Sequence, residues 1–117
     1  MKILITLQNN DIAPRFDLTT EVLIARITRG KISGAPRTIL LPGPSSDELC
    51  SLAIKEEVSL IICGGIEDAH FQYLIWKKIE VIDQIIGPAE EALALAMVKN
   101  LQPRAILRTR PDRSTTP

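Results

Sequence analysis

Apolar and polar positions alternate in a way that divides the chain into short apolar runs separated by turn-forming residues. Five β-branched, apolar runs predict strands, and they cover residues 2–7, 21–28, 31–41, 58–63 and 80–83. The third run contains Gly34 and Pro36, so we expect a break there. Residues 8–20 are polar and include a proline, which predicts a long loop.

Three further segments carry apolar residues at helical spacing, and they cover residues 45–56, 67–78 and 88–100. The first opens with Ser45, and Glu48 follows three positions later, which is the spacing of a capping box. The second places Phe71, Leu74 and Ile75 on one face. Each segment is long enough for about three turns of helix.

The order of these elements predicts an α/β fold. A three-strand meander is followed by helix, strand, helix, strand and helix, which favours a five-stranded mixed sheet with the spatial order three-two-one-four-five. A right-handed crossover makes the fourth strand parallel to the first. If these strands are neighbours, the loops after them emerge side by side, and residues 11–17 and 63–67 form one crevice at a topological switch point.

Composition limits the class of protein. A chain of 117 residues fits one domain, which we place at residues 1–101, and the prolines and arginines of residues 102–117 predict a flexible basic tail. The net charge of zero argues against nucleic acid as a partner. No run is long enough to span a membrane. Two cysteines are too few for a disulfide framework, so we expect free thiols and a cytoplasmic location.

The glycine turn after the fourth strand is the first candidate site. Cys63 ends an apolar run, and Gly64 and Gly65 follow it. Glycines allow close approach of a ligand to the backbone, and a cysteine thiolate is a soft metal ligand. The competing interpretation is that Cys63 is a small buried hydrophobe, and the sequence leaves both open.

The loop after the first strand is the second candidate. Arg15 could balance an anion through its planar guanidinium or be a solvated loop residue. Phe16 is expected to anchor the loop on the sheet. Asp17 could pair with Arg15, bind a cation or cap a turn. His70 is either a ligand facing the crevice or a surface helix residue, and Cys50 is expected to pack in the core.

Three stretches resemble the dinitrogenase iron–molybdenum cofactor biosynthesis family, the NifX-like small domains. The stretches are Met1–Ile5 followed by Ile12-Ala13-Pro14-Arg15-Phe16-Asp17, then residues 58–66, then Ile79-Glu80-Val81 with Pro88-Ala89-Glu90-Glu91-Ala92-Leu93. Together they cover about residues 1–100. Many members carry His where this chain has Arg15, and some have Cys where it has Ile86.

The resemblance implies a ribonuclease-H-like fold and a non-catalytic accessory role. It implies that the chain binds or carries an iron–sulfur or molybdenum-containing cluster and works with metallocluster assembly proteins, and a homo-oligomer is compatible with it. We place the cofactor site at Arg15, Phe16, Asp17, Cys63, Gly64 and Gly65, with Cys63 as the metal ligand. The alternative is a small anion- or nucleotide-binding regulatory module. A phosphoryl-transfer enzyme ranks last, because the chain has no Walker, Rossmann or nucleophile-elbow motif.

Overall fold

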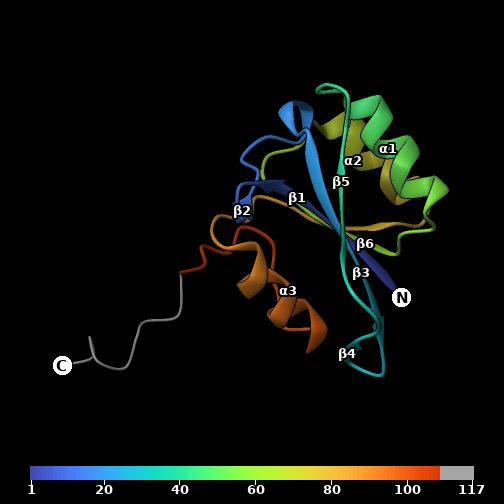
Figure 1. Cartoon of the computed structure of the whole chain (residues 1–117). Helices are drawn as coiled ribbons and strands as arrows, with labels where there is room; N and C mark the ends of the chain where they lie inside the picture. Colours follow the sequence, from blue (N-terminus) through green and yellow to red (C-terminus); the bar gives the residue numbers. More distant parts are fainter. Residues whose placement is uncertain (109–117) are drawn as a thin grey trace.

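The computed structural model describes residues 1–108, which form a mixed sheet flanked by three helices (Figure 1). The strands are β1 (Lys2–Gln8), β2 (Asp11–Ile12), β3 (Glu21–Thr28), β4 (Lys31–Ile32), β5 (Arg37–Leu40), β6 (Leu60–Ile62) and β7 (Glu80–Ile82). The helices are α1 (Ser46–Lys55), α2 (Asp68–Trp76) and α3 (Ala89–Met97), with a short 3-10 turn η1 (Phe16–Leu18).

The sheet confirms the predicted neighbours and corrects the number of strands. Its order is β4-β3-β1-β6-β7, and β5 also pairs with β3. β1 is antiparallel to β3 and parallel to β6, so the path matches three-two-one-four-five when β4 and β5 are counted as the two halves of the third predicted strand. The sheet has seven strands and not five, because that strand is split and because β2 forms inside the expected loop.

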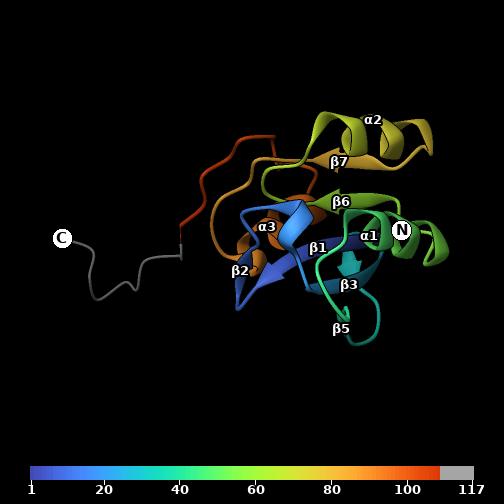
Figure 2. The same ribbon diagram turned by 90° about the horizontal axis from the view of Figure 1, so that it is seen from above.

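Two cores lie on opposite faces of the sheet, because successive side chains of a strand point in opposite directions. Ile3 and Ile5 of β1 pack with α3, whereas Leu4 packs with α1 and α2. Figure 1 shows α1 and α2 on one side of the sheet and α3 on the other. Seen from above in Figure 2, the strands run in order from β7 to β5, and α2 lies beside β7 at one end of the molecule.

The helix starts and faces follow the sequence in part. The Ser45 hydroxyl accepts a hydrogen bond from the Glu48 N–H at 3.2 Å, as a capping box requires. On α2, Leu74 is buried and Phe71 is half-buried, but Ile75 is exposed. The predicted face was therefore wrong at Ile75. Because α2 packs at the end of the sheet, only a narrow strip of the helix is covered.

The chain beyond the predicted domain boundary packs on the domain. We call residues 102–108 the C-terminal segment. Its Arg104 N–H donates to the Asp83 carbonyl at 3.0 Å, and Ile86 and Leu107 are joined by a backbone hydrogen bond of 2.6 Å. The packed chain thus continues past Leu101, which is itself buried. The rest of the predicted tail, residues 109–117, lies outside the described residues.

Candidate ligand site between the loops that follow β1 and β6

The loops after β1 and β6 lie side by side, as the parallel arrangement of these strands predicts. The Phe16 N–H donates to the Gly65 carbonyl at 2.8 Å, and the Gly65 N–H donates to the Pro14 carbonyl at 2.8 Å. Arg15 and Gly65 therefore form a short parallel bridge. The structure brings together the two segments that sequence analysis placed in one crevice.

Gly64 allows this close packing of the two loops. A β-carbon at Gly64 would lie 2.4 Å from the Ala13 carbonyl oxygen and 2.5 Å from that of Pro14, closer than any side chain tolerates. At Gly65 the nearest atom, the Pro14 oxygen, would be 3.5 Å away, which is an ordinary contact. The space beside Gly64, which sequence analysis assigned to a ligand, is thus filled by the protein's own backbone.

Phe16 and Thr19 hold the loop in place. Phe16 is buried among the side chains between the sheet and α1, as predicted for an anchor. The Thr19 hydroxyl donates to the Arg15 carbonyl at 2.8 Å, and the Thr19 N–H donates to the Phe16 carbonyl at 3.2 Å. Since these contacts fix the backbone on both sides of Arg15, its side chain projects from a rigid base.

Arg15 and Asp17 form a two-pronged ion pair at the surface. Arg15 Nε lies 3.0 Å from one Asp17 carboxylate oxygen, and a terminal nitrogen lies 2.6 Å from the other. This hydrogen bonding lowers the pKa of Asp17 and raises the pKa of Arg15. The Arg15 side chain remains 63% exposed, so its other N–H groups are open to a further acceptor.

A cleft of about 250 Å³ opens beside Arg15, and we call it the loop cleft. Its lining consists of Leu7, Gln8, Ala13, Pro14, Arg15, Leu18, Thr19 and Thr20. Among residues 1–108, Arg15 supplies the only charge in this lining, and no carboxylate contributes to it. Sequence analysis missed Gln8, Leu18 and Thr20, because residues outside a motif give no signal that they converge on one cleft.

Cys63 lies outside this cleft and is 0% exposed. Burial, reinforced by the charge of Asp83, raises the pKa of its thiol well above the usual range, so it stays protonated at neutral pH. Within residues 1–108 no group of three or more His, Cys, Asp or Glu side chains is placed to hold a metal ion. The packing interpretation of Cys63 therefore fits its surroundings better than a ligand role does.

His70 and Cys50 belong to a different depression, of about 410 Å³, between α1 and α2. His70 Nε2 lies 3.5 Å from an Asp47 carboxylate oxygen, and its ring centroid is 6.4 Å from that of Phe16. Cys50 is buried, as predicted, and burial raises its pKa to about 11. His70 is half-buried behind the loop and does not line the loop cleft.

The start of α2 is poorly suited to an anion. Glu67 stands at the N-cap position, without a side-chain capping hydrogen bond, and Asp68 follows it, so two carboxylates stand where the helix dipole would attract negative charge. The Gly65 N–H just before them is already bonded to Pro14. Arg15, and not the helix start, is the element of this region that is suited to an anion.

Comparison with known proteins yields similarity in structure alone, since no family description and no curated sequence matches the chain. A crystal structure of a protein named PH0822 superposes with a TM-score of 0.79 at 12% identity, covering 87% of this chain and 93% of that one. A second similar structure has a descriptive name. It is a "putative dinitrogenase" from Methanocaldococcus jannaschii.

That crystal structure has a TM-score of 0.69 at 24% identity and covers 87% of this chain and 92% of that one. An NMR structure of the same protein gives a TM-score of 0.71 at 23% identity, covering 88% and 92%. At these identities the likeness establishes a shared fold over nearly the whole length of both chains. Separately, no helix within residues 1–108 is long and apolar enough to cross a membrane.

Proposed function

We propose that this chain is a non-catalytic accessory protein that carries an anionic metal–sulfide cluster, of the iron–sulfur or molybdenum-containing class, to metallocluster assembly proteins. One observation carries the proposal: the loop cleft has a guanidinium on a rigid loop and, among residues 1–108, no carboxylate in its lining. The fold shared with the "putative dinitrogenase" and the family resemblance of the sequence support this class of cargo. We also assign the sheet order to the ribonuclease-H-like class.

In this proposal the cargo is held by charge and hydrogen bonds. Asp17 occupies two N–H groups of the Arg15 guanidinium, and the remaining N–H groups bind the anion. Gln8 and Thr20 add polar contacts from the lining, and Leu18 adds an apolar one. Direct coordination by protein sulfur does not fit the described residues, because both thiols are buried, so we derive no step through a metal–thiolate bond.

The second candidate is an anion-binding module for phosphate groups. The same lining favours it, since a guanidinium with neutral polar neighbours also binds phosphate oxygens. The two candidates differ in the ligand that binds tightly.

Anaerobic titration with tetrathiomolybdate, an anionic metal sulfide, and with inorganic phosphate separates the two. We expect wild type to bind tetrathiomolybdate, and Arg15→Ala to weaken binding about 10-fold or more, as the loss of a charge-assisted hydrogen bond predicts. Arg15→Lys is the matched control that keeps the charge, and it should retain part of the affinity. Cys63→Ala should bind as wild type does.

Two results would overturn this assignment: equal binding by Arg15→Ala, or loss of binding in a folded Cys63→Ala variant. Tight binding of phosphate without tetrathiomolybdate would support the second candidate.

A further inference from the structure

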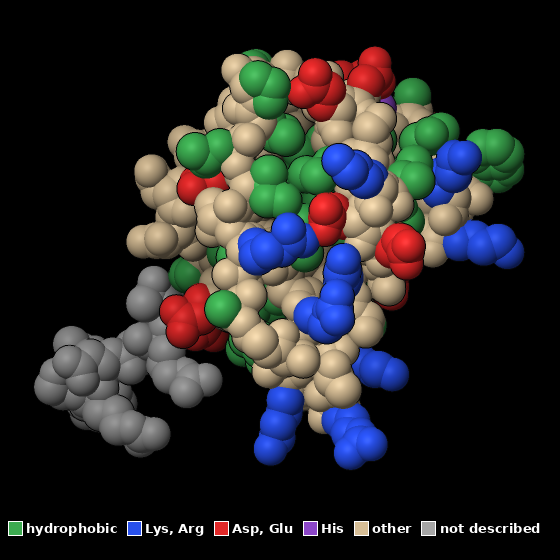
Figure 3. All heavy atoms as spheres, turned by 45° about the vertical axis from the view of Figure 1, so that its right-hand side comes forward, with side chains coloured by type: hydrophobic (Ala, Val, Ile, Leu, Met, Phe, Trp, Pro, Cys, Tyr) green, Lys and Arg blue, Asp and Glu red, His purple; other side chains and the backbone are tan. Residues whose placement is uncertain are grey.

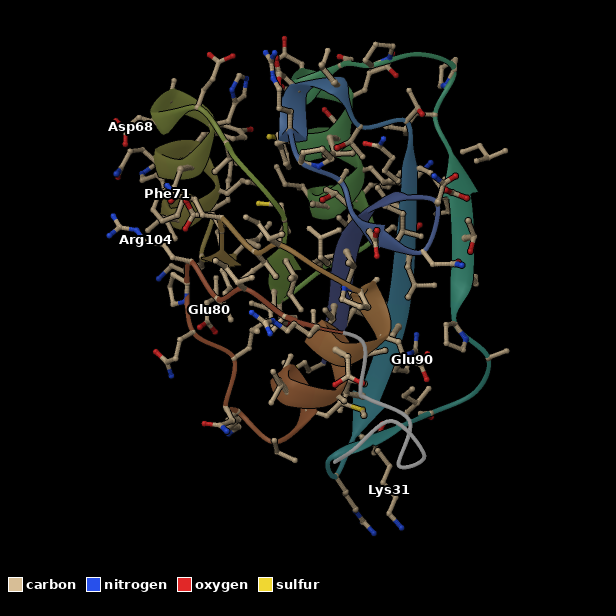
Figure 4. The ribbon with its side chains drawn as sticks, turned by 90° about the vertical axis from the view of Figure 1, so that its left-hand side faces the viewer. Lys31, Asp68, Phe71, Glu80, Glu90 and Arg104 are labelled. Atoms are coloured by element: carbon tan, nitrogen blue, oxygen red, sulfur yellow. The ribbon has the colours of Figure 1, made fainter. Side chains whose placement is uncertain are left out.

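The two edges of the sheet differ in what lies beside them. The C-terminal segment lies against β7 and the loop after it, where the Arg104 N–H bonds to the Asp83 carbonyl. At the other edge β5 pairs with β3, and no further strand of residues 1–108 pairs with β5. Figure 4 shows Arg104 and Glu80 on one side of the molecule and β5 along the opposite margin of the ribbon. Within the described chain, the outer side of β5 is therefore an open edge.

The pairing with β3 determines which backbone groups of β5 face this open edge. The Leu41 N–H donates to the Thr20 carbonyl at 2.8 Å, and antiparallel strands bond at alternate residues, so residues 37, 39 and 41 bond to β3. The N–H and C=O groups of Thr38 and Leu40 therefore point away from the sheet. Outward groups of this kind are a template for a further strand. The Leu40 side chain is itself 73% exposed.

Two prolines limit the open edge symmetrically. Pro36 stands three residues before Ile39, and Pro42 stands three residues after it. Neither proline has an N–H group, so a ladder on this edge cannot extend past them. The outward-bonding residues, Thr38 and Leu40, are the immediate neighbours of Ile39 on either side. The edge is therefore short, and its hydrogen-bonding groups are arranged symmetrically about Ile39.

We propose that β5 pairs with β5 of a second copy of this chain, as two antiparallel strands related by a two-fold axis at Ile39. Thr38 of each copy then lies opposite Leu40 of the other, and each of these pairs exchanges both of its backbone hydrogen bonds. The exposed Leu40 side chain packs beside Thr38 of the second copy, and the two Ile39 side chains face each other across the axis. The two sheets become one continuous sheet. The inference is independent of the proposed function.

A second copy is favoured because a two-fold interface must be complementary to itself. β5 meets this condition, since its outward N–H and C=O groups are symmetric about Ile39. In this register Pro36 lies opposite Pro42 of the second copy, so no N–H of one strand is left facing a proline of the other. A longer foreign strand would face both prolines. Because the C-terminal segment lies against the other edge of the sheet, the pairing stops at two copies.

Charge favours the antiparallel direction. Arg29 and Lys31 are exposed at the turn between β3 and β4, and Figure 3 shows only Lys and Arg among the charged side chains at the lower end of the surface, where β4 lies in Figure 1. Antiparallel pairing directs the two basic turns to opposite ends of the dimer. A strand of four residues buries less area than a stable interface does, so we expect a dissociation constant on the order of 100 µM.

Cross-linking of the full chain tests the register. Ile39→Cys places two thiols opposite each other across the axis, with Cα atoms about 4.5 Å apart, a separation that a disulfide spans. Oxidised glutathione should therefore give a disulfide-linked dimer. Thr38→Cys is the matched control, because its counterpart lies two positions further along the strand, about 8 Å away and beyond the reach of a disulfide. Cys50 and Cys63 are buried and should not compete.

Sedimentation velocity over a concentration series measures association without a cross-link. Leu40→Pro removes one outward N–H and no bond to β3, and it should weaken association about 10-fold or more, because the bond occurs twice in the dimer. Leu40→Ala keeps the N–H and should weaken association less. In wild type, amide hydrogen exchange at Thr38 and Leu40 should slow as the concentration rises, whereas exchange at Arg29 should not change.

Three results would overturn the proposal. The first is a wild type that stays monomeric well above the expected dissociation constant. The second is equal cross-linking of Ile39→Cys and Thr38→Cys, and the third is a dimer that a folded Leu40→Pro variant forms as well as wild type does. Protection of Thr38 and Leu40 that is the same at every concentration and is lost on deletion of residues 109–117 would assign the edge to the chain's own C-terminal end and refute the pairing.

Discussion

Two glycines of this protein hold two different segments in nearly the same way. A β-carbon at Gly64 would meet the Ala13 oxygen at 2.4 Å, and one at Gly87 would meet the Leu107 oxygen at 2.4 Å. The segments differ in what happens when that contact is lost. The loop at Ala13 is tied to strands on both sides, whereas the C-terminal segment can detach. The same close approach to a carbonyl oxygen therefore predicts unequal losses of stability.

The largest expected effect is that of Gly64→Ala. Two backbone oxygens block the new β-carbon and neither can move away, so we expect a loss of about 3 kcal/mol or more in the free energy of unfolding, as for severe overpacking. Urea denaturation measures it. Gly65→Ala, with its nearest atom at 3.5 Å, is the control and should lose under about 1 kcal/mol. Similar stabilities of the two variants would contradict the account.

Gly87→Ala should be less severe. Its φ of +127° is strained for any side chain, and the β-carbon also strikes Leu107. Release of the C-terminal segment relieves the contact, so we expect a loss of about 2 kcal/mol. Limited proteolysis checks the mechanism, since cleavage after Arg104 should accelerate in this variant. Unchanged protection of that bond would show that the turn at Gly87 adapts instead.

Truncation after Leu101 should cost about 1–2 kcal/mol, a fall of several degrees in the thermal midpoint. It removes the backbone hydrogen bonds to Asp83 and Ile86 and the partly buried Leu107. In the truncated chain, Gly87→Ala should retain only its backbone strain, so the two changes should not be additive. An unchanged thermal midpoint on truncation would instead support the prediction from sequence that residues 102–108 belong to a flexible tail.

Asp17→Asn has the smallest expected effect on stability, because the ion pair with Arg15 is exposed. It should increase affinity for an anion several-fold by freeing the guanidinium. The pKa of Asp17 is lowered in the folded chain, so the pair persists above the usual carboxylate pKa and is lost as the pH falls through the lowered value. In anion titrations, the affinity of wild type should therefore be higher at acidic pH than at neutral pH. The affinity of Asp17→Asn should not change in this way.

The sequence predicted the framework well because apolar periodicity reports burial. β3 has the predicted bounds, and Ser45 caps α1 as expected. It could not predict β2, since two residues have no period. It could not predict the packing of the C-terminal segment, because backbone hydrogen bonds hold that segment and composition does not record them.

The contact between the two loops was predicted, and the surroundings of Cys63 were not. Neighbouring loops followed from the parallel pairing of β1 and β6. The role of Cys63 did not follow from the sequence, because a cysteine at the end of a strand points to a crevice or to the core depending on what covers it. Here the loop carrying Phe16 packs in the same core as Cys63.

The central claim is that an anion binds in the loop cleft through Arg15 and without Cys63. Chemical-shift mapping of isotope-labelled protein during anaerobic titration with tetrathiomolybdate tests it most directly. The account predicts the largest shifts at the Arg15 side-chain N–H and at Gln8 and Thr20. Shifts centred on Cys63 and its strand neighbours, with Arg15 unaffected, would contradict it.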